Sequence, residues 1–490
     1  MSVQSFNPES LNTSQRAAVE HDGTHLLIVA GPGTGKTRTL VCRIARLAKT
    51  LSAGRQILAV TFTNKAADEM RERLTALDAA LSEKVEVGTF HAFALQLLRR
   101  YRKRLSFPLG FTVITPDEAE ALAAELMPAA SRRERRDCLL RLSAWKATLQ
   151  PNSNDPALEA LRSALRARGL VDFDDILRDA VLLLRDNSDL AREVRQRYPF
   201  VMVDEYQDVN AIQVELLRLL AGEAQDAPGV RLTVIGDPNQ AIYGFRGSEA
   251  GSFRDFDRTF APCRAISLNE NYRSAGNLLA AGGQVIKAGS SFPVPELVAR
   301  IQDEGRLAVH EAAGEKAEAR FVADEIARLV GGFGHHDQGA HAAGDGHGYA
   351  FGDIAVLFRL KTQSHALEEA LAKAGLPFRT CGVRPPSLSL ASRQALKTAR
   401  DLSSLTAELE RLAAADPVLA ENMERVTTLL ASSASVTEFL DRLSLETPED
   451  VFNSRAGKVS LLTLHAAKGL EFPVVFIVGC ESGLLPLKAD

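Results

Sequence analysis

Residues 25–37 read HLLIVAGPGTGKT, an apolar run that passes into a glycine-rich turn ending in lysine and threonine. Glycines in such a turn let backbone N–H groups close around phosphate oxygens, and a helix that follows adds its positive N-terminal end. Lys36 would reach the β and γ phosphates, and Thr37 would ligate Mg²⁺. The pattern therefore predicts a nucleoside triphosphate site made by Ala30, Gly31, Pro32, Gly33, Thr34, Gly35, Lys36, Thr37 and Arg38.

Residues 200–210, FVMVDEYQDVN, form a second apolar run that ends abruptly in Asp204 and Glu205. By themselves these acids fit either an ordinary strand end or a metal-bound phosphate with a water to activate. The phosphate loop upstream favours the second interpretation, because such folds use a second acidic strand to bring one carboxylate to Mg²⁺. Asp204 would bind Mg²⁺ through water, and Glu205 would orient and deprotonate the attacking water.

The composition is that of a globular protein with several domains. The chain has 490 residues, a length that suggests about three domains. A net charge of −4 argues against a surface coated in positive charge, although a local basic groove for nucleic acid is compatible with it. Five scattered cysteines without C-x-x-C spacing indicate reduced thiols. With no signal-peptide core and no membrane-spanning run, we expect a cytoplasmic protein without membrane contacts.

Short apolar runs followed by polar or glycine-rich turns recur along the chain, and they are typical of strands buried on both faces of parallel sheets. They lie at 25–31, 56–63, 200–205, 232–237, 353–359 and 474–479. The runs fall into an early group and a late group. This division predicts an α/β protein with two parallel-sheet cores, each interrupted by a helical insertion. We expect the first core at 1–92 and 197–275, an insertion without a convincing strand at 93–196, the second core at 276–383 and 455–490, and its insertion at 384–454.

The run at 232–237 is followed by a segment that could join two functions. Gln240 comes just after the expected strand, where it could sense the γ phosphate. Tyr243 and Phe245 follow, with Arg246 next to them. Exposed aromatic rings accept stacked bases at about 1–3 kcal/mol per base. The alternative is that both aromatic rings belong to the core.

Taken together, these strings resemble the UvrD/Rep/PcrA group of superfamily 1 DNA helicases along nearly the whole chain. LNTSQRAAV (11–19) resembles the adenine-recognising segment, with Gln15 as the base reader. In LNENYRS (268–274), the resemblance assigns Tyr272 to stacking on adenine and Arg273 to the γ phosphate. LLTLHAAKGLEFPVVFIVG (461–479) resembles the segment that links the second core to DNA and nucleotide, with Thr463 and His465 on the DNA side and Glu471 on the nucleotide side.

Two further strings, TFTNKAADEM (61–70) and GTFHAF (88–93), resemble motifs that bind single-stranded DNA, and VDFDDIL (171–177) fits another. Hydroxyl, amide and ammonium groups just past a strand can hold DNA phosphates. The predicted DNA-binding residues here are Thr61, Phe62, Thr63, Asn64, Thr89 and His91. Phe62 and Phe90 are equally compatible with packing in the core.

The resemblance implies two RecA-like cores that close on ATP and Mg²⁺, with Arg273 reaching the nucleotide from across a domain junction. It also implies an ATP-dependent single-stranded DNA translocase and 3′-to-5′ helicase that acts on DNA junctions with repair or replication proteins. Two alternatives stay open. One is an ATP-gated DNA-binding fragment or regulator with little hydrolysis of its own, and the other is an RNA helicase, since stacking and phosphate contacts tolerate both sugars.

The chain departs from the family pattern at two places. The insertion in the second core is shorter than in the family, and no segment with the family's last motif and its second arginine follows "GCESGLLP". We expect a fragment of a longer protein rather than a naturally shortened form, because a fold should not end just past a buried strand.

Overall fold

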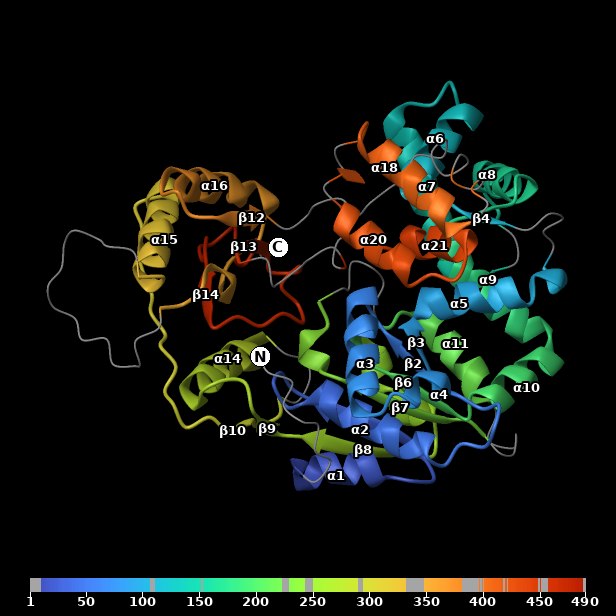
Figure 1. Ribbon diagram of the computed structural model, residues 1–490, viewed down its shortest axis with the longest axis horizontal. Coiled ribbons are helices and arrows are strands. Elements are labelled where there is room, and N and C mark those ends of the chain that lie inside the picture. Colours follow the sequence, from blue (N-terminus) through green and yellow to red (C-terminus); the bar gives the residue numbers. More distant parts are fainter. Residues whose placement is uncertain are drawn as a thin grey trace, which may run out of the picture. The chain divides into compact units, whose positions relative to one another are not determined.

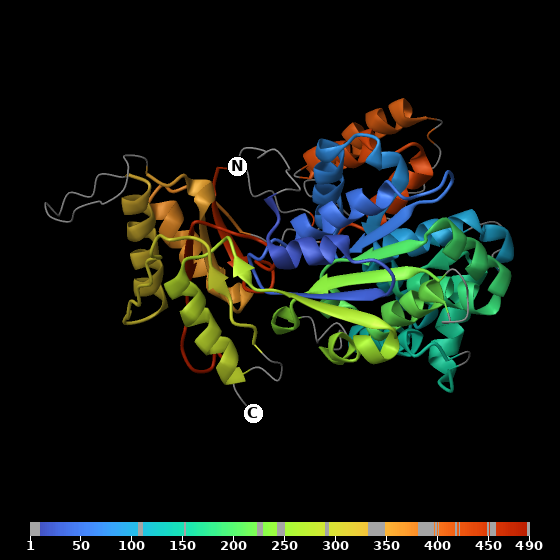
Figure 2. The ribbon, with the colours of Figure 1, turned by 90° about the horizontal axis from the view of Figure 1, so that it is seen from below.

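The computed structural model describes residues 10–105, 111–150, 153–222, 229–242, 250–289, 294–331, 348–380, 396, 399, 401–416, 419–420, 422–447, 450 and 457–487. The chain forms two compact units (Figures 1 and 2). The first unit comprises Met1–Arg306 with Pro386–Glu446, and the second comprises Leu307–Pro385 with Thr447–Asp490.

The first unit is built on a six-stranded sheet in the order β3-β2-β6-β7-β1-β8, in which every neighbouring pair is parallel. Its strands are β1 (His25–Ala30), β2 (Ile57–Thr61), β3 (Val85–Thr89), β6 (Phe200–Val203), β7 (Arg231–Gly236) and β8 (Cys263–Leu268). Every residue of β2 and of β6 is buried, as the apolar runs predicted. In a parallel sheet all carboxyl ends lie at one edge, so the turns after these strands come together.

Helices cover both faces of this sheet. One face carries α1 (Thr13–Glu20), α2 (Lys36–Ala48), α3 (Asn64–Leu77) and α4 (Leu81–Lys84). The other carries α5 (Phe90–Arg100), α9 (Phe173–Asp186), α10 (Ser188–Arg197), α11 (Ala211–Ala221), α12 (Ala250–Arg254) and α13 (Phe256–Thr259). After β8, the short strands β9 (Glu270–Asn271) and β10 (Val298–Ala299) pair in parallel beside α14 (Gly276–Gly289).

The segment predicted as the first insertion contributes a small core of its own. Its further helices are α6 (Pro116–Leu126), α7 (Arg132–Ala147) and α8 (Pro156–Ala167), which bury Leu142 and Trp145. The prediction that this segment lacks strands is wrong at two places, because β4 (Thr112–Val113) and β5 (Leu170–Val171) form a parallel pair. Two residues are too short a run to carry an apolar pattern.

The inserted segment that precedes the last part of the second core packs with the first unit. It contains α18 (Leu402–Ala413), α20 (Met423–Ala431) and α21 (Val436–Ser444). The apolar stripe predicted there is confirmed, because Leu405 and Leu409 are buried between these helices. Asp441 of α21 accepts hydrogen bonds of 2.8 and 2.6 Å from the guanidinium of Arg99 in α5.

The second unit holds a four-stranded, fully parallel sheet in the order β12-β13-β11-β14. Its strands are β11 (Ile354–Phe358), β12 (Phe378–Thr380), β13 (Val459–Thr463) and β14 (Val474–Ile477), and α15 (Glu315–Leu329) and α16 (Ser364–Lys373) pack on one face. Single-turn 3₁₀ helices occur at Arg102–Arg104, Tyr206–Asp208, Pro238–Gln240, Phe351–Asp353 and Lys361–Gln363. The two parallel sheets confirm the predicted α/β class. Among the described residues, no helix has the length and apolar character that crossing a membrane requires.

Candidate nucleotide and nucleic-acid sites

The predicted phosphate loop lies between β1 and α2. Gly33 and Gly35 adopt left-handed backbone angles, with φ of +68° and +81°, which glycine reaches without steric cost. A side chain at Gly33 would overlap Asn271 and the β-carbon of Arg273. The loop therefore needs glycine both for its turn and for the close approach of the segment after β8.

The carbonyl oxygens of residues 31–34 all accept hydrogen bonds from neighbouring groups. In order, the donors are the Thr34 hydroxyl (2.8 Å), the Asn271 side-chain amide (2.6 Å), the Tyr272 backbone N–H (2.8 Å) and the Gln15 side-chain amide (3.0 Å). These contacts fix the orientation of the peptide groups in the loop. Because its carbonyls already have partners, the loop is preorganised to offer N–H groups to an anion.

Gln15, the predicted base reader, is buried and already bonded at both ends of its amide. Its oxygen accepts from the N–H of Asn12 (3.1 Å), and its nitrogen donates to the carbonyl of Thr34. Arg43 of α2 holds this region together, because it donates to the carbonyls of Ala18 (2.9 Å) and His21 (2.7 Å). The sequence offered no signal for Arg43, which lies on the buried side of α2.

Tyr272, predicted to stack on the base, keeps a partly exposed ring while its hydroxyl is held in place. The hydroxyl accepts from the side-chain amide of Asn12 (3.0 Å) and donates to Glu270 (2.9 Å). Glu270 in turn forms an ion pair with Arg300 at 2.7 Å. An exposed ring with a fixed tilt is suited to receive a planar base.

Asp204 and Glu205 follow β6, whose neighbours in the sheet are β2 and β7. Burial, and then the charge of Glu205, raises the pKa of Asp204 to about 7, while Lys36 acts in the opposite direction. A buried carboxylate in this position gains a stable charge when a cation binds beside it. The donor set fits Mg²⁺, which is usually held by one or two carboxylates together with phosphate oxygens, and Thr37 and Asp204 are the residues that would hold it.

The segment after β7 and the segment after β8 reach the same edge of the sheet. Gln240 ends a 3₁₀ turn, and its N–H donates to the carbonyl of Asp237 (3.0 Å). Arg273 lies in the first unit together with the phosphate loop. The structure therefore differs from the expectation that Arg273 reaches the nucleotide from across a domain junction, because Asn271 and Tyr272 bind its segment directly to the loop.

The predicted DNA-binding threonines stand at the carboxyl ends of β2 and β3, where Thr61 pairs with Thr89 in the sheet. Thr63 caps α3 by accepting from Ala66 N–H (3.1 Å), and Thr89 caps α5 by accepting from Ala92 N–H (3.2 Å). Thr61 is buried, and its hydroxyl donates to the carbonyl of Thr63. Two helix N-termini therefore lie side by side, an arrangement that favours phosphate groups.

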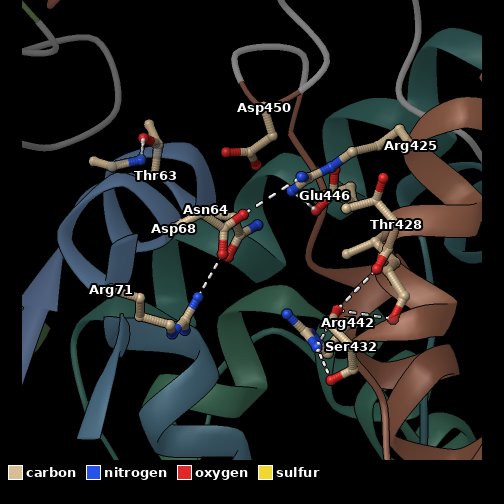
Figure 3. A network of polar contacts seen from close by, with 12 residues as sticks. Thr63, Asn64, Asp68, Arg71, Arg425, Thr428, Ser432, Arg442, Glu446 and Asp450 are labelled. Carbon is tan, nitrogen blue, oxygen red and sulfur yellow. Dashed lines mark hydrogen bonds and ion pairs between the residues drawn. The ribbon is translucent and has the colours of Figure 1, made fainter. Parts of the chain in front are cut away.

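Asn64 contacts the inserted segment. Its side-chain amide donates to the carbonyl of Leu445 (3.0 Å), directly after α21. Nearby, Arg425 forms two hydrogen bonds with Glu446 (2.8 and 2.9 Å) and a 3.4 Å ion pair with Asp68, which also pairs with Arg71 (Figure 3). The predicted phosphate contact of Asn64 is thus adjacent to a network of charges.

His91 packs its ring on Phe173 of α9, with ring centroids 3.6 Å apart. Burial lowers the pKa of His91 to about 3, so the imidazole is neutral at physiological pH. Phe90 is buried in the core, which decides between its two interpretations, whereas Phe62 is partly buried. The segments GTFHAF and VDFDDIL therefore contact each other through the rings of His91 and Phe173.

The remaining predicted residues fall into two groups. Tyr243, Phe245 and Arg246 lie outside the described residues. Thr463, His465 and Glu471 belong to the second unit, where His465 contacts Arg359 at 3.2 Å and Thr463 caps the turn after β13.

A parallel sheet whose strand ends carry a phosphate loop, an acidic pair and an arginine segment defines a phosphate-loop nucleoside triphosphatase. Matches to family models identify the family within this class. A model described as the UvrD/REP helicase N-terminal domain matches residues 11–261, and a model of the UvrD-like helicase C-terminal domain matches residues 266–385 and 387–489. The chain belongs to the UvrD/Rep helicase family, as the resemblance indicated.

Individual relatives agree. ATP-dependent DNA helicase UvrD1 of Mycobacterium tuberculosis is 30% identical over 98% of this chain and 78% of its own length. UvrD2 of Mycobacterium bovis is 33% identical over 98% of this chain and 73% of its own length. DNA helicase II of Escherichia coli is 29% identical over 98% of this chain and 80% of its own length. The alignment with UvrD1 spans 614 positions against 490 residues here, so that relative contains residues that this chain lacks.

Proposed function

We propose that this protein hydrolyses ATP to move along single-stranded DNA in the 3′-to-5′ direction and to unwind duplex DNA at junctions, in repair or replication. The observation that carries this proposal is the convergence at one sheet edge of the phosphate loop, Asp204, Glu205 and the Arg273 segment. The polarity rests on the motif resemblance, and the relatives named as DNA helicases support the substrate.

In this proposal the first unit binds and positions the nucleotide. The N–H groups of Gly33, Thr34 and Gly35 surround the phosphates, Lys36 pairs with their charge, and Tyr272 stacks on the base. Bound Mg²⁺ would neutralise charge on the phosphate oxygens. Glu205 accepts the proton of the attacking water, and Arg273 stabilises the charge that develops on the transferred phosphoryl group. Glu471, in the segment of the second unit that resembles a nucleotide-linked motif, would be a further nucleotide-binding residue.

The DNA strand would be held by the helix N-termini after β2 and β3, with Thr63, Asn64 and Thr89 at those turns. Thr463 and His465 would hold it on the second unit, and Tyr243, Phe245 and Arg246 would contact its bases. Since β2, which leads to the Thr63 turn, pairs with β6, which leads to Asp204 and Glu205, a change at the nucleotide can move the strand contacts.

The test is ATP turnover by the 490-residue chain with and without single-stranded DNA. Glu205→Gln should abolish turnover and leave ATP binding intact, and Arg273→Ala should lower kcat by about a hundredfold or more while ATP binding weakens less. Duplexes with a 3′ or a 5′ single-stranded tail then measure unwinding and its direction. Binding of ATP and DNA without turnover would replace the motor by an ATP-gated DNA-binding protein, and preferential stimulation by RNA would make it an RNA helicase.

A further inference from the structure

Gln207 makes contacts that join the acidic pair to the neighbouring strand. It lies in the 3₁₀ turn Tyr206–Asp208 and is 1% exposed. Its side-chain nitrogen donates to the carboxylate of Glu205 at 2.5 Å, and its side-chain oxygen accepts from the backbone N–H of Asp237 at 3.0 Å. One amide thus connects the end of β6 with the end of β7.

Glu205 needs such support because its backbone is unusual. Its φ of +52° and ψ of +45° place it in the left-handed region, which is rare for a residue with a side chain. Conformations of this kind persist where surrounding contacts determine them, and they occur often at functional sites. In this structure, the Glu205 carboxylate accepts a hydrogen bond from the Gln207 side-chain amide.

The structure reserves space for the Gln207 amide. Gly236 is the last residue of β7, and a β-carbon built there would overlap the Gln207 side-chain oxygen. The same β-carbon would come within 3.1 Å of the Phe253 ring and of the Tyr206 backbone nitrogen. The amide therefore occupies a defined position between the two strand ends.

Asp237, whose backbone N–H binds the Gln207 side chain, also organises the turn that contains Gln240. The carbonyl of Asp237 accepts from Gln240 N–H (3.0 Å), and its carboxylate accepts from Asn239 N–H (3.0 Å). We propose that Gln207 is a positioning residue, which aims Glu205 at the attacking water and makes that aim depend on the position of the Asp237–Gln240 turn. This rests on the proposed role of Glu205 as the base.

A merely structural role would require only that Gln207 satisfy the buried N–H of Asp237. The structural and positioning roles can be separated, because the side-chain oxygen contacts Asp237 and the side-chain nitrogen contacts Glu205. Gln207→Glu keeps an oxygen for Asp237 N–H, but it replaces the donor to Glu205 by a second acceptor of like charge. Gln207→Ala removes both contacts. Gln213→Ala is the matched control, because Gln213 is also buried and accepts from the N–H of Asn210 (3.0 Å) in the capping box of α11.

The experiment measures kcat and KM for DNA-stimulated ATP turnover, affinity for a fluorescent ATP analogue, and thermal midpoints. We expect Gln207→Glu and Gln207→Ala to lower kcat by about tenfold to a hundredfold, as small misplacements of catalytic groups do, with analogue affinity preserved. Gln213→Ala should keep its kcat.

Other results would overturn the proposal. Unchanged kcat in Gln207→Glu, with Glu205→Gln inactive, would show that Glu205 is aimed by other groups. Parallel losses of kcat, analogue affinity and thermal midpoint in both Gln207 variants would assign Gln207 a structural role. Absence of turnover in the wild type and in Gln213→Ala would instead refute the proposed function, and the role of Gln207 would fall with it.

Discussion

The side-chain amide of Asn271 donates a 2.6 Å hydrogen bond to the carbonyl of Pro32, across 239 residues of sequence. Its oxygen accepts from the backbone N–H groups of Arg273 (2.9 Å) and Ser274 (2.8 Å). This one fully buried side chain therefore holds the backbone of Arg273 against the phosphate loop. The contacts that hold the arginine segment at the loop therefore lie within the first unit.

Asn271→Asp should lower kcat by about tenfold through displacement of Arg273. The carboxylate can still accept from the N–H of Arg273, but it cannot donate to the carbonyl of Pro32. Steady-state ATPase kinetics would measure the effect, and little additional loss in an Arg273→Ala background would show that it acts through Arg273. Asn277→Asp is the control, since Asn277 bonds Gly305 in a comparable way away from the loop. An equal loss in that control would contradict the prediction.

Tyr272→Ala should raise the KM for ATP by about two- to tenfold, because ring stacking contributes about 0.5–1.5 kcal/mol. Tyr272→Phe keeps the ring and removes only the hydroxyl that Asn12 and Glu270 hold. We expect a smaller increase for Tyr272→Phe, from the lost orientation of the ring. KM values for ATP in both variants test this, and equal increases would show that the hydroxyl contacts rather than stacking determine affinity.

The free energy of unfolding should depend on pH through His91. The pKa of the half-buried imidazole is about 3 in the folded protein, against an ordinary value of 6.5. Between these values the unfolded chain binds a proton that the folded chain does not, so stability falls as pH falls below 6.5. His91→Gln removes this contribution. Urea unfolding at pH 7 and pH 5 should show a larger loss for the wild type than for the variant, and equal losses would contradict the lowered pKa of His91.

Lys146→Met should destabilise the first insertion by about 3–5 kcal/mol, because it removes the ammonium that neutralises the carboxylates of Asp172 and Asp175. The fully buried ammonium contacts Asp172 (2.5 Å) and Asp175 (2.8 Å). Burial, and then the charge of Asp175, raises the pKa of Asp172 to about 6, so the loss should be smaller at pH 5 than at pH 8. Fluorescence of Trp145, the single tryptophan, follows unfolding. Exposed Lys49→Met is the control.

In the six-stranded sheet of the first unit, the strands that the sequence predicts and those it does not differ in their place. β1, β2, β6 and β7 are interior strands, so apolar residues fill both faces and form recognisable runs. β3 and β8 are the edges, and their sequences, VEVGT and CRAISL, mix polar with apolar residues. An edge strand with solvent on one side has no need of a continuous apolar run.

In the site too, residues whose roles depend on neighbours in sequence are predictable, whereas residues whose contacts lie far along the chain are not. Lys36, Asp204 and Glu205 are predictable because their chemistry depends on residues next to them in sequence. Asn271 and Arg43 act on backbone carbonyls far along the chain, and a hydrogen bond to a carbonyl leaves no trace in the partner's side chain. The position of Arg273 relative to the phosphate loop therefore requires the folded structure.

Docking of the inserted segment on the first unit should depend on the pair of Arg99 and Asp441. Arg99 donates two hydrogen bonds to Asp441, and its guanidinium also lies 4.0 Å from the ring centroid of Phe111. Asp441→Asn keeps the shape but removes the charge and one of the two acceptors. A charged hydrogen bond contributes about 1.5–3 kcal/mol, so α21 should detach more often.

Limited proteolysis can measure this detachment, because cleavage tracks the population of the open form when opening is fast. Asp441→Asn should be cleaved faster within the inserted segment, and added salt should increase cleavage of the wild type more than that of the variant. Glu438→Gln changes an exposed acid of the same helix and serves as control. If Asp441→Asn and Glu438→Gln were cleaved at the wild-type rate, apolar packing rather than the ion pair would hold α21 in place.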